Sequence, residues 1–251
     1  MDLYEAFALV PGAIVAAVGG GGKTSLVHAL AAAAAGRGLS AVVTTTTKFT
    51  RPPGMPMPPV IETSDLDAAR DIGDRLHPRL TLVACTGIGP RARLLGFEPG
   101  TIAAIAAVSP GLIAVEADGS AQRPFKAPGE HEPAIPAAAT DVIVCVGLEV
   151  LGHELGARWV HRPELVATLA EASQGDPVTA DMIVRVLLHD RGGRRALPPG
   201  ARIHALLNNP PTGEHEILGM HIAERLVYGG FWRSVVATAH RPHGDVRAVV
   251  K

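Results

Sequence analysis

The most informative stretch of the sequence is Val18-Gly19-Gly20-Gly21-Gly22-Lys23-Thr24-Ser25. It lies between an apolar run over residues 13–18, typical of a strand buried on both faces, and an Ala- and Leu-rich run over residues 24–35, typical of a helix. The glycines allow the backbone to turn its N–H groups inward, and the helix N-terminus adds the positive end of its dipole. The stretch therefore predicts a phosphate-binding loop between a strand and a helix.

Two side chains are expected to complete this loop. Lys23 would reach the β- and γ-phosphates, and the Thr24 hydroxyl would ligate Mg²⁺. The motif G-x-x-x-x-G-K-[ST] has a glycine where this chain has Ala17, so the loop is a variant. The alternative is a glycine-rich turn with an incidental lysine, which the flanking strand and helix disfavour. The predicted nucleotide-binding residues of the loop are Gly19, Gly20, Gly21, Gly22, Lys23, Thr24 and Ser25.

A carboxylate is expected at the end of another parallel strand, because the metal must neutralise charge on the transferring phosphoryl group. The apolar run over residues 112–115 ends in Glu116-Ala117-Asp118-Gly119-Ser120. Glu116 is the first candidate for the metal, and Asp118 is the alternative ligand or the residue that orients water. An ordinary Asp-Gly turn after a strand is the competing interpretation. We predict catalytic roles for Lys23, Glu116 and Asp118, and metal-binding roles for Thr24, Glu116 and Asp118.

Hydroxyl groups gather at the carboxyl end of the next predicted strand, residues 39–47, which is followed by Lys48. Ligands of open α/β sheets bind beyond the carboxyl ends of the strands, so these hydroxyls could meet phosphate or metal. At least about half of them must fill the strand as β-branched residues, because side chains alternate between faces. We select Thr46, Thr47 and Lys48 as candidate substrate or partner residues.

Residues 118–139 show neither helical nor strand periodicity, and they contain a proline-stiffened charged loop. This loop is either a solvated connection or a preorganised substrate or partner site. His131 lies between Glu130 and Glu132 and is a candidate general base or metal ligand. A second group lies before Pro163, where the alternative is a loop leading into a helix. The candidates from the two groups are Arg123, Lys126, His131, Glu132, His161 and Arg162.

Apolar runs of strand length alternate with segments of helical period along the chain. Strands are expected at residues 13–18, 39–47, 81–86, 111–117, 141–146, 201–207 and 234–239, and helices at 24–35, 66–76, 101–108, 164–172, 179–188 and 215–227; the proline-rich residues 51–59 form an extended loop. The pattern predicts a three-layer α/β fold like that of P-loop NTPases, with a mostly parallel sheet and helices on both faces. No linker divides the composition, so we expect a single domain over residues 1–251.

Composition limits the classes of partner. Lys and Arg number 23 against 24 Asp and Glu, a net charge of −1, which removes the general electrostatic argument for nucleic acid or an anionic membrane. The start of the chain is acidic, unlike a signal peptide, and no apolar stretch is long enough to span a membrane, so we expect a cytoplasmic protein. Cys85 and Cys145 lack metal-ligand spacing. A homodimer is left open.

Several short blocks in sequence order resemble the YqeC family, whose members are accessory proteins of selenium-dependent molybdenum hydroxylases. The resemblance runs from about residue 13 to about residue 170. It implies a role in maturing or loading a labile selenium-containing molybdenum cofactor, with the hydroxylase or its cofactor as client. The blocks that carry it are V-G-G-G-G-K-T at 18–24, T-T-T-T-K at 44–48, V-E-A-D-G-S at 115–120, P-F-K-A-P at 124–128, H-E-P at 131–133, V-G-L at 146–148 and V-H-R-P-E at 160–164.

The sequence Glu116-Ala117-Asp118-Gly119 is also similar to the E-x-x-G element of the nickel-enzyme metallochaperones of the SIMIBI class. In that class N-K-x-D reads guanine after a late strand. Here Asn208 is followed by Asn209-Pro210-Pro211, so the lysine and aspartate are missing. We expect Asn208 at the nucleotide site, with ATP or GTP left open. An ATP-dependent kinase or ligase and a nucleotide-binding partner protein without turnover are the alternatives to an NTP-hydrolysing maturation factor.

Overall fold

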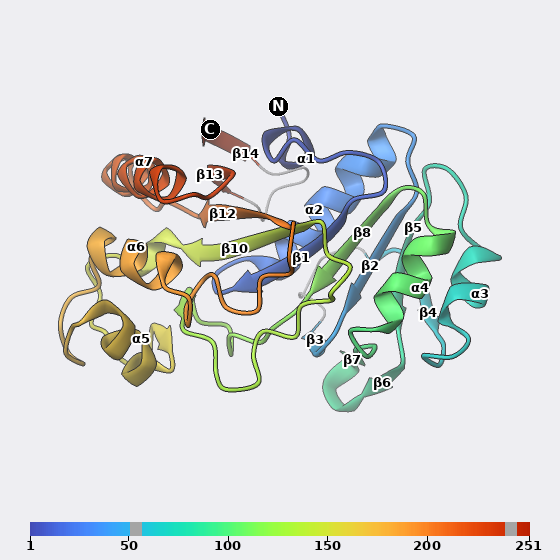
Figure 1. Ribbon diagram of the computed structural model, residues 1–251, viewed down its shortest axis with the longest axis horizontal. Helices are drawn as coiled ribbons and strands as arrows, with labels where there is room; N and C mark the ends of the chain where they lie inside the picture. The colour runs from blue at the N-terminus through green and yellow to red at the C-terminus, as the bar shows by residue number, and fades with distance from the viewer. Residues whose placement is uncertain (51–56, 239–244) are drawn as a thin grey trace.

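The computed structural model describes residues 1–50, 57–238 and 245–251. Within these residues the main feature is a nine-stranded sheet of order β14-β13-β12-β10-β1-β8-β2-β5-β4 (Figure 1). Neighbouring strands are parallel except for the last pair, β13 with β14. Its strands are β1 (Ile14–Gly19), β2 (Ala41–Thr45), β4 (Val60–Glu62), β5 (Thr81–Cys85), β8 (Leu112–Glu116), β10 (Asp141–Gly147), β12 (Arg202–Asn208), β13 (Arg233–Thr238) and β14 (Asp245–Val250).

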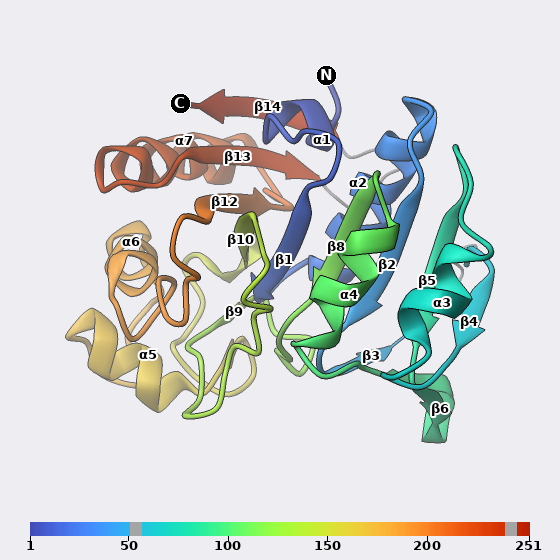
Figure 2. The same ribbon diagram turned by 45° about the vertical axis from the view of Figure 1, so that its right-hand side comes forward.

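Helices cover both faces of this sheet, as the two views together show (Figures 1 and 2). Side chains of β1 alternate between two apolar cores, with Val15 in one and Ala16 in the other. The first core is covered by α1 (Leu3–Ala6) and α2 (Lys23–Gly36). The second is covered by α3 (Ala68–Gly73), α4 (Thr101–Val108), α5 (Pro163–Ala170), α6 (Ala180–Leu188) and α7 (Gly213–Tyr228). The predicted three-layer, mostly parallel architecture is confirmed.

Several helices begin where the sequence offers a capping residue. The Thr179 hydroxyl accepts a hydrogen bond from the N–H of Met182 at the start of α6, and Thr212 accepts one from His215 at the start of α7. Helix α5 begins with Pro163, whose fixed φ suits the first helical position. These local signals explain why the predicted helix boundaries differ from the observed ones by only a few residues here.

The predicted strand over residues 39–47 is shorter in the structure. The Thr45 hydroxyl accepts a hydrogen bond from the N–H of Thr47 and donates one to the Glu116 carbonyl, so the chain turns after β2. It then enters a separate three-stranded sheet made of β3 (Lys48–Thr50), β7 (Arg93–Leu95) and β6 (Gly87–Gly89), with the 3-10 helix η1 (Pro90–Ala92) between β6 and β7.

The other differences involve short elements. The predicted helix over residues 66–76 is only α3 (Ala68–Gly73), and the predicted irregular segment 118–139 contains β9 (Phe125–Lys126). Strand β9 pairs with β11 (Val160–His161), and the 3-10 helix η2 (Leu148–Val150) lies before β11. Most of the predicted proline-rich loop, residues 51–56, and the last residue of the predicted strand 234–239 lie outside the described residues. No described helix is long and apolar enough to cross a membrane.

Candidate functional site

The glycine-rich loop lies at the carboxyl end of β1, between the neighbouring strands β8 and β10. Gly21 and Gly22 have φ angles of 71° and 126°, which other residues rarely adopt. A Cβ at Gly20 would lie 2.6 Å from the carbonyl oxygen of Arg123, and one at Gly22 would collide with the amide of Asn208. The glycines are therefore required both by the turn and by the close packing around it.

Three N–H groups of the loop donate hydrogen bonds to acceptors of the protein. These bonds tie the loop to the end of β8, to β10 and to the segment that precedes β9. The pairs are Gly19 with a carboxylate oxygen of Asp118 (2.9 Å), Gly20 with the carbonyl of Cys145 (2.9 Å) and Gly21 with the carbonyl of Arg123 (3.1 Å). The first-turn N–H groups of α2 follow directly in sequence, and Ser25 lies in this turn.

Lys23 is the first residue of α2, and its side chain folds back into the loop. Its ammonium donates to the carbonyl of Gly19 at 2.6 Å and lies 3.2 Å from Asp118. Burial would lower the pKa of Lys23, but the negative charges of Asp118 and Glu116 outweigh it and raise the pKa. The loop therefore holds a buried, charged ammonium group.

Thr24 and Glu116 bring a hydroxyl and a carboxylate together beside this ammonium. The Thr24 hydroxyl donates to Glu116 Oε2 at 2.8 Å, across the contact of α2 with β8. Burial raises the pKa of Glu116, and Lys23 and Thr24 oppose that rise. Among the described residues no group of three or more His, Cys, Asp and Glu could hold a metal ion. Two oxygen ligands of this kind suit Mg²⁺, which takes its other ligands from phosphate and water.

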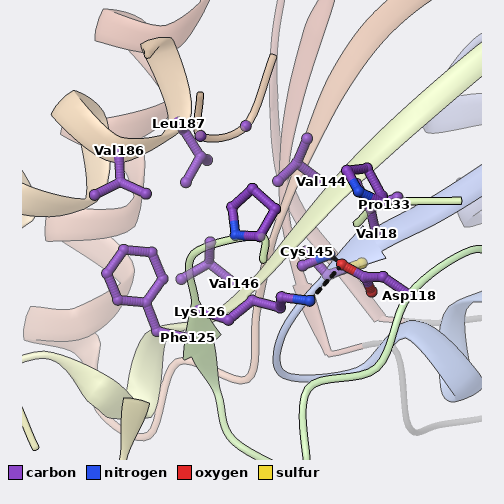
Figure 3. A pocket seen from close by; sticks show the side chains of 14 residues that line it. Val18, Asp118, Phe125, Lys126, Pro133, Val144, Cys145, Val146, Val186 and Leu187 are labelled. Carbon is purple, nitrogen blue, oxygen red and sulfur yellow. Dashed lines mark hydrogen bonds and ion pairs between the residues drawn. The ribbon is translucent and has the colours of Figure 1, made fainter. Parts of the chain in front are cut away.

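Asp118 lies between two buried lysines, Lys23 and Lys126. Figure 3 shows its contact with Lys126. Lys126 donates to Asp118 at 2.9 Å, to the carbonyl of Gly119 at 2.6 Å and to Glu132 at 2.5 Å. These three acceptors match the three protons of an ammonium group. Lys126 therefore joins the end of β8 to the charged loop.

Glu132 continues this connection to the start of α5. Arg162 donates to both of its carboxylate oxygens, at 2.7 and 3.0 Å. Burial would raise the pKa of Glu132, but the hydrogen bonds and charges of Arg162 and Lys126 outweigh it and lower the pKa to about 2. We refer to the series Lys23, Asp118, Lys126, Glu132 and Arg162 as the ion chain.

The candidate residues after β2 lie outside the ion chain. They are Thr46, Thr47 and Lys48. Thr46 donates its hydroxyl hydrogen bond to the carbonyl of Ala134 at 2.7 Å, and Thr47 is held by Thr45. Lys48 is exposed at the start of β3. These contacts fasten the turn after β2 to neighbouring segments, and none of them joins the ion chain.

The remaining candidates lie around the charged loop. The Arg123 side chain donates to the carbonyl of Ala157 at 2.7 Å. His161 is paired with Lys126 in the β9–β11 sheet, and burial lowers its pKa. His131 is exposed, with no hydrogen bond or ion pair to any other part of the described chain. The ion chain thus unites Lys126, Glu132 and Arg162 but leaves Arg123 and His131 outside it.

Asn208 ends β12 beside the glycine-rich loop. Its side-chain amide donates to the carbonyl of Gly21 at 2.8 Å. Sequence reasoning missed the Cys145 carbonyl, which fixes the loop, and Arg195, which donates to the carbonyl groups of Glu132 (2.8 Å) and Glu130 (2.5 Å). Backbone acceptors carry no sequence signal, and Arg195 lies in a turn-rich segment far along the chain.

The family model described as YqeC protein matches residues 15–164 of the chain. The uncharacterized protein YqeC of Escherichia coli (strain K12) is 31% identical over 218 residues, which are 85% of this chain and 82% of that protein. No solved structure matches the chain. The matched range contains the glycine-rich loop, the end of β8 and the whole ion chain.

Proposed function

The chain belongs to the YqeC family, and we propose that it binds a nucleoside triphosphate with Mg²⁺ in the glycine-rich loop. One observation carries this proposal: at the start of α2 the Thr24 hydroxyl lies 2.8 Å from the Glu116 carboxylate, beside the buried ammonium of Lys23. This site suits a metal-bound polyphosphate, because a cation and a helix N-terminus can bind the phosphates while a hydroxyl and a carboxylate can bind the metal.

The proposed roles follow from these positions. Lys23 holds the terminal phosphates, Thr24 and Glu116 hold Mg²⁺, and Asp118 orients water or acts as the alternative metal ligand. The bound ion would neutralise charge on the phosphates. Asn208 keeps the loop in shape through its hydrogen bond to Gly21. The residues after Asn208 lack the carboxylate that would read guanine, so the sequence does not favour GTP over ATP. The identity of the base stays open.

The proposed activity is hydrolysis of the nucleotide in a maturation factor for a selenium-dependent molybdenum hydroxylase or its cofactor. The family resemblance supports this client. The ion chain supports nucleotide-dependent action, because it leads from Lys23 to a surface loop and the start of α5. A change at the phosphates could therefore alter a surface that meets the client.

A second candidate is an ATP-dependent kinase or ligase that acts on a small substrate. It is favoured by a polar pocket next to residues 128–130, close to the Glu132 end of the ion chain. ADP formation that depends on a small substrate would identify this activity, whereas stimulation only by a client protein would identify a maturation factor.

The test of nucleotide binding compares Lys23→Ala with Lys251→Ala, which removes an exposed lysine outside the loop and outside the candidate residues. Removal of a charge-assisted phosphate contact costs about 1.5 to 3 kcal/mol, or roughly tenfold or more in affinity. Calorimetric titrations with Mg²⁺ and ATP or GTP should show this loss in Lys23→Ala only. Equal affinities in the two variants would refute the assignment of the site.

A further inference from the structure

Three arginines from two distant segments surround residues 128–132. Arg162 pairs with the carboxylate of Glu132, while Arg195 donates to the carbonyl groups of Glu130 and Glu132 at 2.5 and 2.8 Å. Arg191 lies four residues before Arg195 and is exposed. The segment after α6 is thereby fastened to the charged loop that follows β8.

The charges of two of these arginines, Arg191 and Arg195, have no carboxylate partner among the described residues. Arg162 has Glu132 as its partner, but Arg195 donates only to backbone carbonyl groups. The Arg191 guanidinium has no hydrogen bond or ion pair with any part of the described chain. Two arginines without a carboxylate partner thus line the same pocket, which favours a negatively charged ligand.

A pocket of about 360 Å³ opens between these segments and α5. Its size suits a small molecule. Among the described residues of its lining, Glu130 is the one carboxylate against two arginines, and Thr168 lies on the α5 side. The lining residues are Pro128, Gly129, Glu130, Leu165, Thr168, Leu169, Arg191 and Arg195.

The walls of this pocket are held in place before any ligand arrives. Two hydrogen bonds from Arg195 fix the backbone of residues 130–132. A Cβ at Gly129 would lie 2.9 Å from the guanidinium carbon of Arg162, so the loop packs directly against that side chain. A preorganised wall lowers the entropy cost of binding.

The pocket is also connected to the glycine-rich loop. Glu132, whose carbonyl is held by Arg195, contacts Lys126 at 2.5 Å, and Lys126 contacts Asp118 at 2.9 Å. Asp118 in turn pairs with Lys23. The pocket and the loop lysine are therefore joined by consecutive hydrogen bonds and ion pairs.

We propose that this pocket is a second ligand site. It binds a small molecule that carries a carboxylate or phosphate group, and Arg191 and Arg195 bind that group. Its use as the substrate site of a nucleotide-dependent reaction rests on the proposed function. Binding of the anion itself does not, because the pocket residues differ from those of the glycine-rich loop.

The test uses calorimetric titration with citrate and with inorganic phosphate, each in the Lys23→Ala background. This background weakens phosphate binding by the glycine-rich loop, so the part of the phosphate affinity that Arg191→Ala removes reports on the pocket. At least one anion should bind, and the one that binds more tightly distinguishes a carboxylate from a phosphate ligand. Adding Arg191→Ala should weaken binding about tenfold or more, and Arg191→Lys should weaken it less.

Arg75→Ala is the matched control, because Arg75 is also an exposed arginine but lies outside the pocket lining. It should leave the anion affinity unchanged. Failure of both anions to bind, or equal affinities in Arg191→Ala and Arg75→Ala, would overturn the second site. Nucleotide titrations of the wild-type chain are a separate measurement, so failure of the pocket and failure of the nucleotide site can be told apart.

Discussion

The ammonium of Lys23 lies 3.2 Å from a carboxylate oxygen of Asp118, and the two side chains are only 4% and 2% exposed. The other oxygen of the same carboxylate accepts the N–H of Gly19 at 2.9 Å. A lysine and a backbone N–H are the donors that a glycine-rich loop offers to a phosphate. In this structure Asp118 therefore occupies donors that we assign to the nucleotide, and the two anions would compete for them.

This competition predicts that Asp118→Asn lowers the stability of the chain but increases its stabilisation by nucleotide. Removing the carboxylate leaves two buried lysines short of a partner, which should destabilise the chain by about 3 to 5 kcal/mol. A bound triphosphate would restore a negative charge next to Lys23, so Mg²⁺ and nucleotide should raise the melting temperature more in Asp118→Asn than in the wild type. Thermal unfolding with and without nucleotide measures both effects.

The control for this experiment is Asp74→Asn, which removes an exposed carboxylate at the end of α3. It should change neither the stability nor the response to nucleotide by much. If nucleotide stabilised Asp118→Asn no more than the wild type, competition between Asp118 and phosphate would be excluded.

Glu116→Gln should distinguish the contribution of Mg²⁺ to nucleotide binding from that of the loop itself. The substituted side chain can still accept from Thr24 but has lost its charge. We expect Mg²⁺ to improve nucleotide affinity less than in the wild type, and hydrolysis to fall at least roughly tenfold. Titrations with and without Mg²⁺ and a phosphate-release assay measure these changes, with Glu98→Gln as an exposed control. An unchanged Mg²⁺ dependence would contradict the role of Glu116.

The parts of the site that the sequence predicts well are continuous in the chain. Residues 18–25 carry the end of the strand, the glycines and the start of the helix together, and residues 112–120 carry a buried strand with its polar end. Apolar runs and turn residues are local properties, so the positions of β1, α2 and β8 could be predicted. The adjacency of β1 and β8 then places Glu116 near Thr24.

The ion chain could not be predicted in the same way. Glu132 and Arg162 lie 30 positions apart, and Lys126 and His161 meet in strands of two residues each, which are too short to show periodicity. The sequence drew attention to Lys126, Glu132 and Arg162 only as charges near prolines. Their partners depend on how the loop after β8 folds back against α5, which no local pattern specifies.

Substitutions of Asn208 test whether the glycine-rich loop needs the Asn208 hydrogen bond to keep its conformation. Asn208→Ala removes the hydrogen bond to the carbonyl of Gly21 and should lower stability by about 1 kcal/mol. Asn208→Asp should be worse for nucleotide affinity, because it places a negative oxygen near that carbonyl and near the phosphate site. Calorimetry and urea unfolding of both variants give the comparison. Equal nucleotide affinities in Asn208→Asp and the wild type would show that the loop keeps its shape unaided.

The last prediction concerns Glu132, whose pKa of about 2 lies below the ordinary value of 4.5. A carboxyl group with a lowered pKa in the folded state stabilises the fold above its unfolded pKa, and that contribution is lost as the pH falls toward the folded pKa. The stabilisation should therefore be complete at neutral pH and should decline from about pH 4.5 toward about pH 2. Because the side chain is 24% exposed, solvent screening reduces it to about 2 kcal/mol.

Urea unfolding of the wild type and Glu132→Gln at pH 7, 5, 4 and 3 would measure this contribution. The wild type should be more stable by about 2 kcal/mol at pH 7, and the difference should shrink as the pH falls below about 4.5, because the carboxylate of the unfolded wild-type chain then takes up a proton, which favours unfolding, whereas glutamine does not titrate. Glu130→Gln, an exposed neighbour, should track the wild type at every pH. A difference that stayed constant down to pH 3 would show that Glu132 acts through packing and not through its ion pairs with Lys126 and Arg162.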